Sequence, residues 1–290
     1  GNRHQIAVTG LGGIGKSTLA LYYAHLAKSY KLYDVICWIE AEVTNLISTS
    51  YQRLMRELKA NIEDPTDEGL VSSLNHYLKD KKFLFLYDNV VDLDTIQNFI
   101  PKGEKGHIVI TSRKDESQFQ DPTFVLDILE LGTFRREEST RYLFKVINRN
   151  KEIIPSTKEN SYLAGRVAKK LGDFPLALSQ AASYIFMKSC GFERYLEELK
   201  HSNPALFKAG SRDSKKVDIK KAVYTTWDTT LRSLSPLAQL LMTECSYLAA
   251  DMIPIDLLKQ AHGQNQEIEE AIDSLKSYSM IKRGGQEGQY

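Results

Sequence analysis

Along roughly the first 130 residues, short apolar runs alternate with longer segments in which apolar and polar residues mix. The runs hold four to seven residues, are rich in Val, Ile and Phe, and carry apolar residues on both faces, which is typical of buried strands. They are IAVT (6–9), DVICWIE (34–40), KFLFLYD (82–88), HIVITS (107–112) and TFVLDI (123–128). The segments between them repeat apolar residues every three or four positions and predict helices over residues 17–29, 46–60, 67–78 and 93–100. Because strands alternate with helices, we expect an α/β domain over residues 1–130, with a parallel sheet covered by helices on both faces.

After residue 130 the pattern has helical periodicity alone. It predicts amphipathic helices over residues 135–150 and 158–171, followed by an almost wholly apolar helix over residues 176–187. Pro175 stands at the start of this last helix, in the first turn, where the missing N–H of proline costs no hydrogen bond. We therefore expect a small helical domain over residues 131–207.

A polar stretch, KAGSRDSKKVD (208–218), follows and has the composition of a linker. SYSMIKRG (277–284), near the end, resembles a strand that enters a short hairpin. Helices followed by a β-ribbon predict a winged-helix domain over residues 208–290, truncated at its C-terminal end. Both ends of the sequence are abrupt, so we interpret the chain as a piece of a longer protein. The helices predicted in this last part cover residues 220–234, 236–248, 255–262 and 266–275.

The overall composition indicates a soluble protein with no special affinity for polyanions. Lys and Arg number 38 against 37 for Asp and Glu, a net charge of +1, so nucleic acid is an improbable partner. No apolar run approaches the about 20 residues of a membrane span, which argues against a membrane location. The three cysteines (Cys37, Cys190 and Cys245) lie far apart, without the spacing of a zinc site or a disulfide framework. We expect free thiols in a reducing compartment, the cytoplasm.

Residues 10–17, GLGGIGKS, fit the phosphate-loop pattern G-x-x-x-x-G-K-[ST] between a predicted strand and a predicted helix. The glycines allow successive backbone N–H groups to turn inward around phosphate oxygens. Lys16 can place its ammonium between the outer phosphates, and the Ser17 hydroxyl can bind Mg²⁺. The loop also contains GxGxxG, but the Lys-Ser pair has no role in a dinucleotide fold. We predict nucleotide contacts from Gly10, Leu11, Gly12, Gly13, Ile14, Gly15, Lys16, Ser17 and Thr18, with Lys16 also catalytic.

Two further residues follow apolar strands and complete the predicted site. Asp88 ends the strand in FLFLYDNV (83–90), where a carboxylate can hold Mg²⁺, so we predict a catalytic and metal-binding role for it. The next residue, Asn89, cannot act as a general base, which argues against efficient hydrolysis. Arg113 follows HIVITS at the same edge of the sheet, where its guanidinium could contact the γ-phosphate or simply face solvent.

Taken in order, these motifs resemble the NB-ARC family of STAND-class P-loop NTPases, the switch module of immune receptors and apoptosis scaffolds. GLGGIGKSTLA is similar to the family's phosphate loop, LFLYDNVVD to its Walker B strand, and ITSR, ending in Arg113, to its sensor motif. LELGTFRREESTRYLF is similar to the entry into the family's helical domain, and LGDFPLALSQAASYI to its GxPLAL motif. AVYTTWDTTLRSLSPLAQLLMTECSYL resembles the opening of its winged-helix domain, especially in members with C-terminal tetratricopeptide repeats.

The resemblance implies a nucleotide-operated switch. ADP would hold a closed, inactive monomer, and exchange for ATP, with Mg²⁺, would release the winged-helix domain and lead to self-association. Pro175 would lie against the base or ribose of the nucleotide. An effector domain and sensor repeats would flank the chain, and with Asn89 after Asp88 the chain would be a slow ATPase at most.

Two other classes of protein are alternatives. A P-loop kinase or similar enzyme would need an arginine-rich lid and an acceptor pocket, whereas the second half predicts helical modules. A DNA-binding regulator could use the predicted winged helix, near which lysines cluster, but the candidate recognition helix EIEEAIDSLKSY (267–278) is acidic and would repel phosphate. The lysines concerned are Lys215, Lys216, Lys220 and Lys221.

Overall fold

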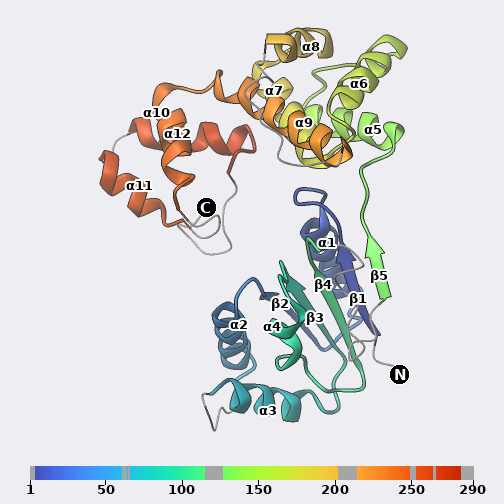
Figure 1. Cartoon of the computed structure of the whole chain (residues 1–290), viewed down its shortest axis with the longest axis vertical. Helices are drawn as coiled ribbons and strands as arrows, with labels where there is room; N and C mark the ends of the chain where they lie inside the picture. Colours follow the sequence, from blue (N-terminus) through green and yellow to red (C-terminus); the bar gives the residue numbers. More distant parts are fainter. Residues whose placement is uncertain are drawn as a thin grey trace. The chain divides into compact units, whose positions relative to one another are not determined.

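In a computed structural model, the chain divides into two units, Gly1–Gly132 and Thr133–Tyr290 (Figure 1). The structure describes residues 4–60, 64, 66–114, 127–201, 214–248, 253–263 and 266–281, with the backbone alone over 214–220.

The first unit is built on a parallel sheet of five strands, as the sequence predicts. The strands lie in the order β2-β3-β4-β1-β5, so β4 separates the strand of the phosphate loop, β1, from the strand that ends in Asp88, β3. All five predicted strands are present, although β5 includes only the last part of the expected run, and residues 123–126 lie outside the described residues. The strands are β1 (His4–Thr9), β2 (Val35–Glu40), β3 (Phe83–Asp88), β4 (Gly106–Thr111) and β5 (Asp127–Glu130).

Helices cover both faces of this sheet, which confirms the layered α/β prediction (Figure 1). Alternate residues of each strand point to opposite faces. On one face Val8, Leu84 and Val109 pack with Ala20 and other residues of α1 (Lys16–Ser29). The other face forms a larger core with α2 (Thr44–Glu57), α3 (Asp67–Leu78) and α4 (Leu93–Gln97). The predicted site residues lie at the carboxyl ends of the strands: the phosphate loop follows β1, and Asp88 ends β3.

The described part of the second unit is helical. One of its helices, α8, was not predicted, although its buried residues Phe192, Tyr195, Leu196 and Leu199 have helical spacing. Another, α9, begins at Ser214, so the predicted linker over 208–218 is wrong from that residue on, while residues 208–213 lie outside the described residues. The helices are α5 (Arg136–Ile147), α6 (Lys158–Lys170), α7 (Pro175–Lys188), α8 (Phe192–His201), α9 (Ser214–Leu231), α10 (Pro236–Cys245), α11 (Ile255–His262) and α12 (Gln266–Ser277).

The strand predicted over residues 277–284 is not formed in its described part. Ser277 ends α12, and the backbone then turns: the Ser279 N–H donates to the Lys276 carbonyl, and the Met280 N–H to the Leu275 carbonyl. Ser279 has a φ of 58°, which a strand cannot accommodate. Residues 282–284 lie outside the described residues, so the winged-helix assignment stays a prediction.

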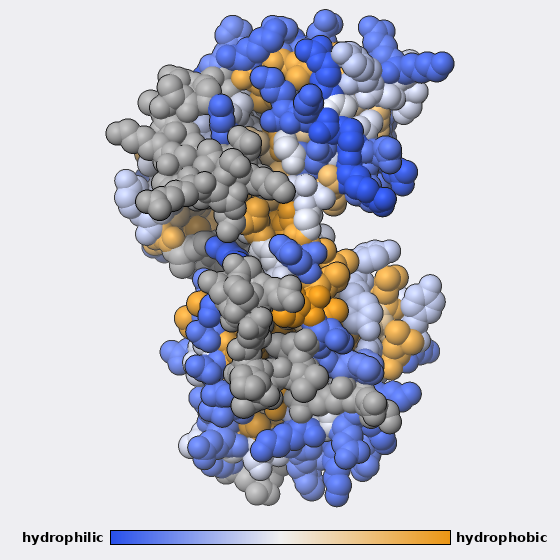
Figure 2. All heavy atoms as spheres, turned by 45° about the vertical axis from the view of Figure 1, so that its right-hand side comes forward, coloured by the Kyte–Doolittle hydropathy of each residue, from blue (hydrophilic) through white to orange (hydrophobic). Residues whose placement is uncertain are grey.

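The surface carries some exposed apolar side chains, and the cysteines are free. Figure 2 shows orange, hydrophobic groups among the blue, hydrophilic ones on the face it draws, and α1 contributes Leu19 and Leu21 to the exposed apolar side chains. Cys37 and Cys190 are buried and free, and Cys245 is half-buried and free. Burial raises the pKa of the Cys37 thiol to about 12, so this thiol is protonated at neutral pH. Among the described residues, no helix combines the length and apolarity that crossing a bilayer requires.

Candidate functional site

The glycine-rich loop joins β1 to α1 and has the backbone conformation that its sequence predicts. Gly10, Gly13 and Gly15 have φ angles of 133°, 81° and 107°, a region open mainly to glycine. At Gly10 a Cβ atom would also lie 2.7 Å from the carbonyl oxygen of Leu131, so a side chain has no room there. Gly15 caps α1, whose first turn therefore presents its N–H groups to the loop, an arrangement that favours anions.

Lys16 is the first residue of α1, and its side chain is buried, with 6% exposed. Its Nζ donates hydrogen bonds to the carbonyl oxygens of Gly10, at 2.9 Å, and Leu11, at 3.0 Å. Burial lowers the pKa of Lys16, the positive charge of Arg113 lowers it further, and the carboxylate of Asp88 opposes both effects. The ammonium is thus held inside the loop, next to a second cation and a single carboxylate.

Asp88 lies at the carboxyl end of β3 and joins the loop through hydrogen bonds. The hydroxyl of Ser17 donates to Asp88 Oδ1 at 2.7 Å, and the hydroxyl of Thr111 donates to the same oxygen. Thr111 ends β4, the strand between β1 and β3, and sequence reasoning missed it because strand order cannot be read from the chain. The predicted pair of metal-binding residues is therefore in direct contact.

Asn89, directly after Asp88, adopts a left-handed conformation with a φ of 60°. Its N–H donates to the hydroxyl oxygen of Thr111 at 3.0 Å, which fixes the turn after β3. Its side chain lines a cavity of about 240 Å³ that contains one carboxylate, that of Glu42. Sequence reasoning missed Glu42, which follows β2 and has no motif around it. The cavity is lined by Glu42, Asn89, Val90, Val91, Ser112, Arg113 and Lys114.

Arg113 follows β4 and lies beside the phosphate loop. A Cβ atom on Gly12 would be 3.7 Å from Arg113 Nε, so the guanidinium borders the loop although the residue is exposed. Two cations, Lys16 and Arg113, thus meet at the loop with Asp88 as the adjacent carboxylate. This charge balance suits an anion with several negative charges, such as the phosphates of a nucleotide.

The remaining predicted residues take different positions. Ile14 is buried, and its N–H donates to the Leu11 carbonyl at 3.2 Å, which supports the loop from within. Thr18 is exposed on α1. Pro175 is the first residue of α7, as predicted, but it belongs to the second unit, so its contact with a nucleotide stays a prediction.

The donors at this site fit Mg²⁺ better than a transition metal. A hydroxyl and a carboxylate are hard oxygen ligands, and Mg²⁺ takes one or two such groups while phosphates and waters supply the rest. Within the part of the chain that the structure describes, no three His, Cys, Asp or Glu side chains cluster as they would around a protein-enclosed metal.

Three comparisons with known proteins agree with this geometry. The sequence model of the NB-ARC domain matches residues 1–152. A nucleotide-binding leucine-rich repeat (NLR)-like protein of Hyaloscypha variabilis is 24% identical over 96% of this chain and 30% of its own length. A putative disease resistance protein of Arabidopsis thaliana is 26% identical over 67% of this chain and 24% of its own length. The chain thus spans less than a third of the curated relatives it matches.

One solved structure has a similar fold. It is a signal transduction ATPase with numerous domains (STAND) from Pyrococcus horikoshii, which carries a tetratricopeptide repeat sensor. The likeness covers all of this chain and 38% of that one, with a TM-score of 0.57 and 13% sequence identity. At this identity the likeness concerns the fold.

Proposed function

This chain belongs to the NB-ARC family, and on that basis we propose that it is the ATP/ADP-operated switch of a larger signalling protein. With ADP it forms a closed monomer. With ATP it opens and self-associates. The proposed arrangement has a nucleotide-binding domain over residues 1–130, a helical domain over 131–207 and a winged-helix domain over 208–290.

The observation that carries this proposal is the convergence of five side chains on one loop. Lys16 and Arg113 supply positive charge, while Ser17, Asp88 and Thr111 form a hydrogen-bonded group beside them. When bound, Mg²⁺ would neutralise phosphate charge and bridge the nucleotide to the protein. Ser17 and Asp88 are the residues that would hold it.

Arg113 is the residue best placed to distinguish ATP from ADP. A switch responds to a nucleotide only through a difference in affinity between its two states. The guanidinium of Arg113 borders Gly12 at the mouth of the loop, where a γ-phosphate would add charge that ADP lacks. A bond from Arg113 to the γ-phosphate would give that difference, and the loss of the bond would return the chain to its resting state.

Hydrolysis by this site should be slow. The residue after Asp88 is an asparagine whose amide cannot take a proton from water. Glu42 lines the same cavity as Asn89 and Arg113, but it is exposed to solvent and shares the cavity with two cations, Arg113 and Lys114. The chain therefore functions as a binding switch with an ATPase rate far below that of a metabolic enzyme.

The surroundings of the switch follow from its relatives. The family, the resistance proteins and the STAND protein with its repeat sensor support an effector domain and sensor repeats, for example tetratricopeptide repeats, flanking this chain. The three free cysteines support a reducing compartment, the cytoplasm. The partner in the ATP state would be a second copy of the same protein.

The first test is to purify the chain, denature it and identify the released nucleotide by chromatography. We expect close to one ADP per chain. The second measurement is light scattering during gel filtration after exchange into a non-hydrolysable ATP analogue with Mg²⁺, where we expect an increase in mass. Rapid turnover of added ATP would instead support a P-loop kinase or another ATP-dependent enzyme. Tight binding of duplex DNA would support the DNA-binding regulator.

A further inference from the structure

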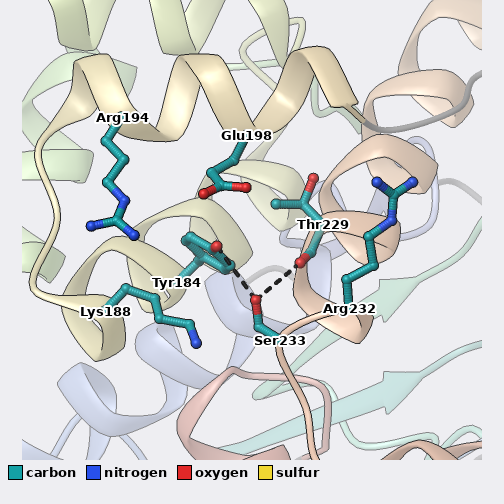
Figure 3. Close-up of a pocket in the computed structure, with 7 residues that line it drawn as sticks. All are labelled: Tyr184, Lys188, Arg194, Glu198, Thr229, Arg232 and Ser233. Carbon is teal, nitrogen blue, oxygen red and sulfur yellow. Dashed lines mark hydrogen bonds between the residues drawn. The ribbon is translucent and has the colours of Figure 1, made fainter.

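The second unit contains a cavity of about 330 Å³ that is separate from the phosphate loop (Figure 3). It lies between the end of α7, the middle of α8 and the end of α9 with the two residues that follow it. Its volume is at the lower end of the range for small-molecule sites. The residues that line it are polar or charged: Tyr184, Lys188, Arg194, Glu198, Thr229, Arg232 and Ser233.

Two of the three cations in this cavity have no ion-pair partner among the described residues. Lys188 ends α7 and Arg194 lies in the first turn of α8, and across the described residues neither side chain has an ion-pair partner. In Figure 3 the Lys188 ammonium points toward Ser233, and the Arg194 guanidinium extends from α8 toward Lys188. Two cations that line the same cavity and have no ion-pair partner among the described residues make a site for an anion.

Arg232, the third cation, is already engaged. Its guanidinium pairs with Asp228 one turn earlier on α9 and donates to the His201 carbonyl at 2.6 Å. These bonds tie the end of α9 to the end of α8. Arg232 therefore shapes the cavity wall, whereas Lys188 and Arg194 are available to a ligand.

The opposite part of the cavity offers hydroxyl groups and one carboxylate. Tyr184 and Thr229 are buried, each 5% exposed. Ser233 Oγ lies 3.4 Å from both the Tyr184 hydroxyl and the Thr229 carbonyl oxygen, distances at the long limit of hydrogen bonding that leave capacity for a ligand. Glu198 is half-buried, and Figure 3 shows its carboxylate pointing from α8 toward Tyr184.

We propose that this cavity binds a small phosphorylated polyol, with its phosphate between Lys188 and Arg194 and its hydroxyl groups against Glu198, Tyr184 and Ser233. The two ends of the cavity differ in chemistry, so they suit a molecule with an anionic end and a hydroxyl-rich end. A bound molecule of this class would join α7, α8 and α9 and stabilise their packing.

Nucleic acid and acidic peptides fit this site less well. Both need an extended basic surface, whereas here Glu198 lies within the cavity and Asp228 beside it. The volume of the cavity, about 330 Å³, also suits one small molecule. All seven lining residues belong to the second unit, so the site shares no residue with the phosphate loop.

The test is isothermal titration calorimetry of the full chain with glucose 6-phosphate at low ionic strength, where charge interactions are least screened. We expect saturable binding that weakens at least tenfold in a Lys188→Gln, Arg194→Gln double variant. Lys169→Gln, an exposed lysine of α6 outside the cavity, is the matched control and should bind like the native chain. Lys16→Met should also bind normally, which separates this site from the phosphate loop.

Glu198→Gln tests the polyol end. This change should weaken binding of glucose 6-phosphate while leaving inorganic phosphate unchanged or slightly tighter, because a repelling carboxylate is removed. The proposal would be overturned by an absence of binding, by binding that the double variant retains, or by binding that Lys16→Met abolishes. Equal tightening for both ligands in Glu198→Gln would overturn the assignment of a polyol. None of these outcomes depends on whether the phosphate loop acts as a switch.

Discussion

The Ser17 hydroxyl donates a 2.7 Å hydrogen bond to Asp88 Oδ1, although the two residues are 71 positions apart in the sequence. The bond reaches across β4, from the start of α1 to the end of β3. It brings a hydroxyl and a carboxylate together at the carboxyl edge of a parallel sheet, beside the buried ammonium of Lys16. The site thus concentrates hard oxygen ligands and positive charge at one edge of the sheet.

The first prediction concerns the role of Asp88 in metal binding. We expect Asp88→Asn to lower the affinity for ADP at least tenfold in the presence of Mg²⁺ and to change it little in EDTA, because the amide binds Mg²⁺ poorly but still accepts hydrogen bonds from Ser17 and Thr111. Titration calorimetry under both conditions measures this difference. Asp92→Asn is the matched control, since Asp92 is a surface residue paired with Lys114 at 3.1 Å. Equal losses with and without Mg²⁺ would contradict the metal role.

The second prediction concerns the pH dependence of stability. Burial and the charge of Arg113 lower the pKa of Lys16 below its ordinary 10.5, so the folded chain holds this proton less tightly than the unfolded chain does. At pH values below the pKa of Lys16 in the folded chain, its buried charge lowers the free energy of unfolding. This loss disappears as the pH rises toward 10.5. Relative to Lys16→Met, the native chain should gain stability as the pH rises.

Urea unfolding of the nucleotide-free chain between pH 7 and pH 10 measures this gain. Lys28→Met removes an exposed lysine from the last turn of the same helix and controls for the loss of a lysine as such. A constant difference between the native chain and Lys16→Met across this range would show that the environment of Lys16 does not disfavour its charge.

The third prediction concerns the conformation of the phosphate loop. Gly10→Ala should destabilise the first unit by about 1–3 kcal/mol, because alanine rarely adopts a φ of this sign and its methyl group meets the Leu131 carbonyl. Gly132→Ala is the control, since a Cβ atom there has nothing within 4 Å. Chemical denaturation followed by circular dichroism gives the free energy of unfolding of both variants. Similar losses of stability in the two variants would show that position 10 does not specifically require glycine.

The fourth prediction compares two adjacent arginines at the start of α5. Arg136 donates to Asp173 Oδ1 at 2.8 Å, to Asp173 Oδ2 at 2.6 Å and to the Gly165 carbonyl at 2.9 Å. Arg136→Met leaves a largely buried carboxylate without this partner and should cost about 1–2 kcal/mol, since the pair is partly exposed to solvent. Arg135, whose side chain is 82% exposed, pairs with Glu138. Arg135→Met should change the unfolding midpoint much less. A larger loss of stability in Arg135→Met than in Arg136→Met would contradict a stabilising role for the pair between Arg136 and Asp173.

The layered fold of the first unit could be predicted because its strands are apolar on both faces and its helices are periodic. Phe83, Leu84 and Phe85 are fully buried in succession, which only a sheet covered on both sides permits. The phosphate loop could be predicted for a similar reason, because its glycines and Lys16 follow a short motif in which each residue type has a known role in holding phosphate. In both cases the pattern is local.

What the sequence could not predict depends on contacts between distant residues. Thr111 joins Asp88 because β4 lies between β1 and β3, an order that no local pattern encodes. Glu42 meets Asn89 and Arg113 for the same reason. Elsewhere composition was misleading: the polar residues after Ser214 resemble a linker but form the first turns of α9.

The order of the strands also determines when the nucleotide site can form during synthesis. β1 pairs with β4 and β5, and His4 faces His107, so its nearest partner emerges from the ribosome roughly a hundred residues later. At typical rates of translation this delay is about 5–20 s. β2 and β3 can form the first ladder meanwhile. Until β4 emerges, β1 and the phosphate loop behind it lack the neighbouring strand that they have in the finished sheet, so a chain truncated before β4 would leave β1 without either of its two partner strands.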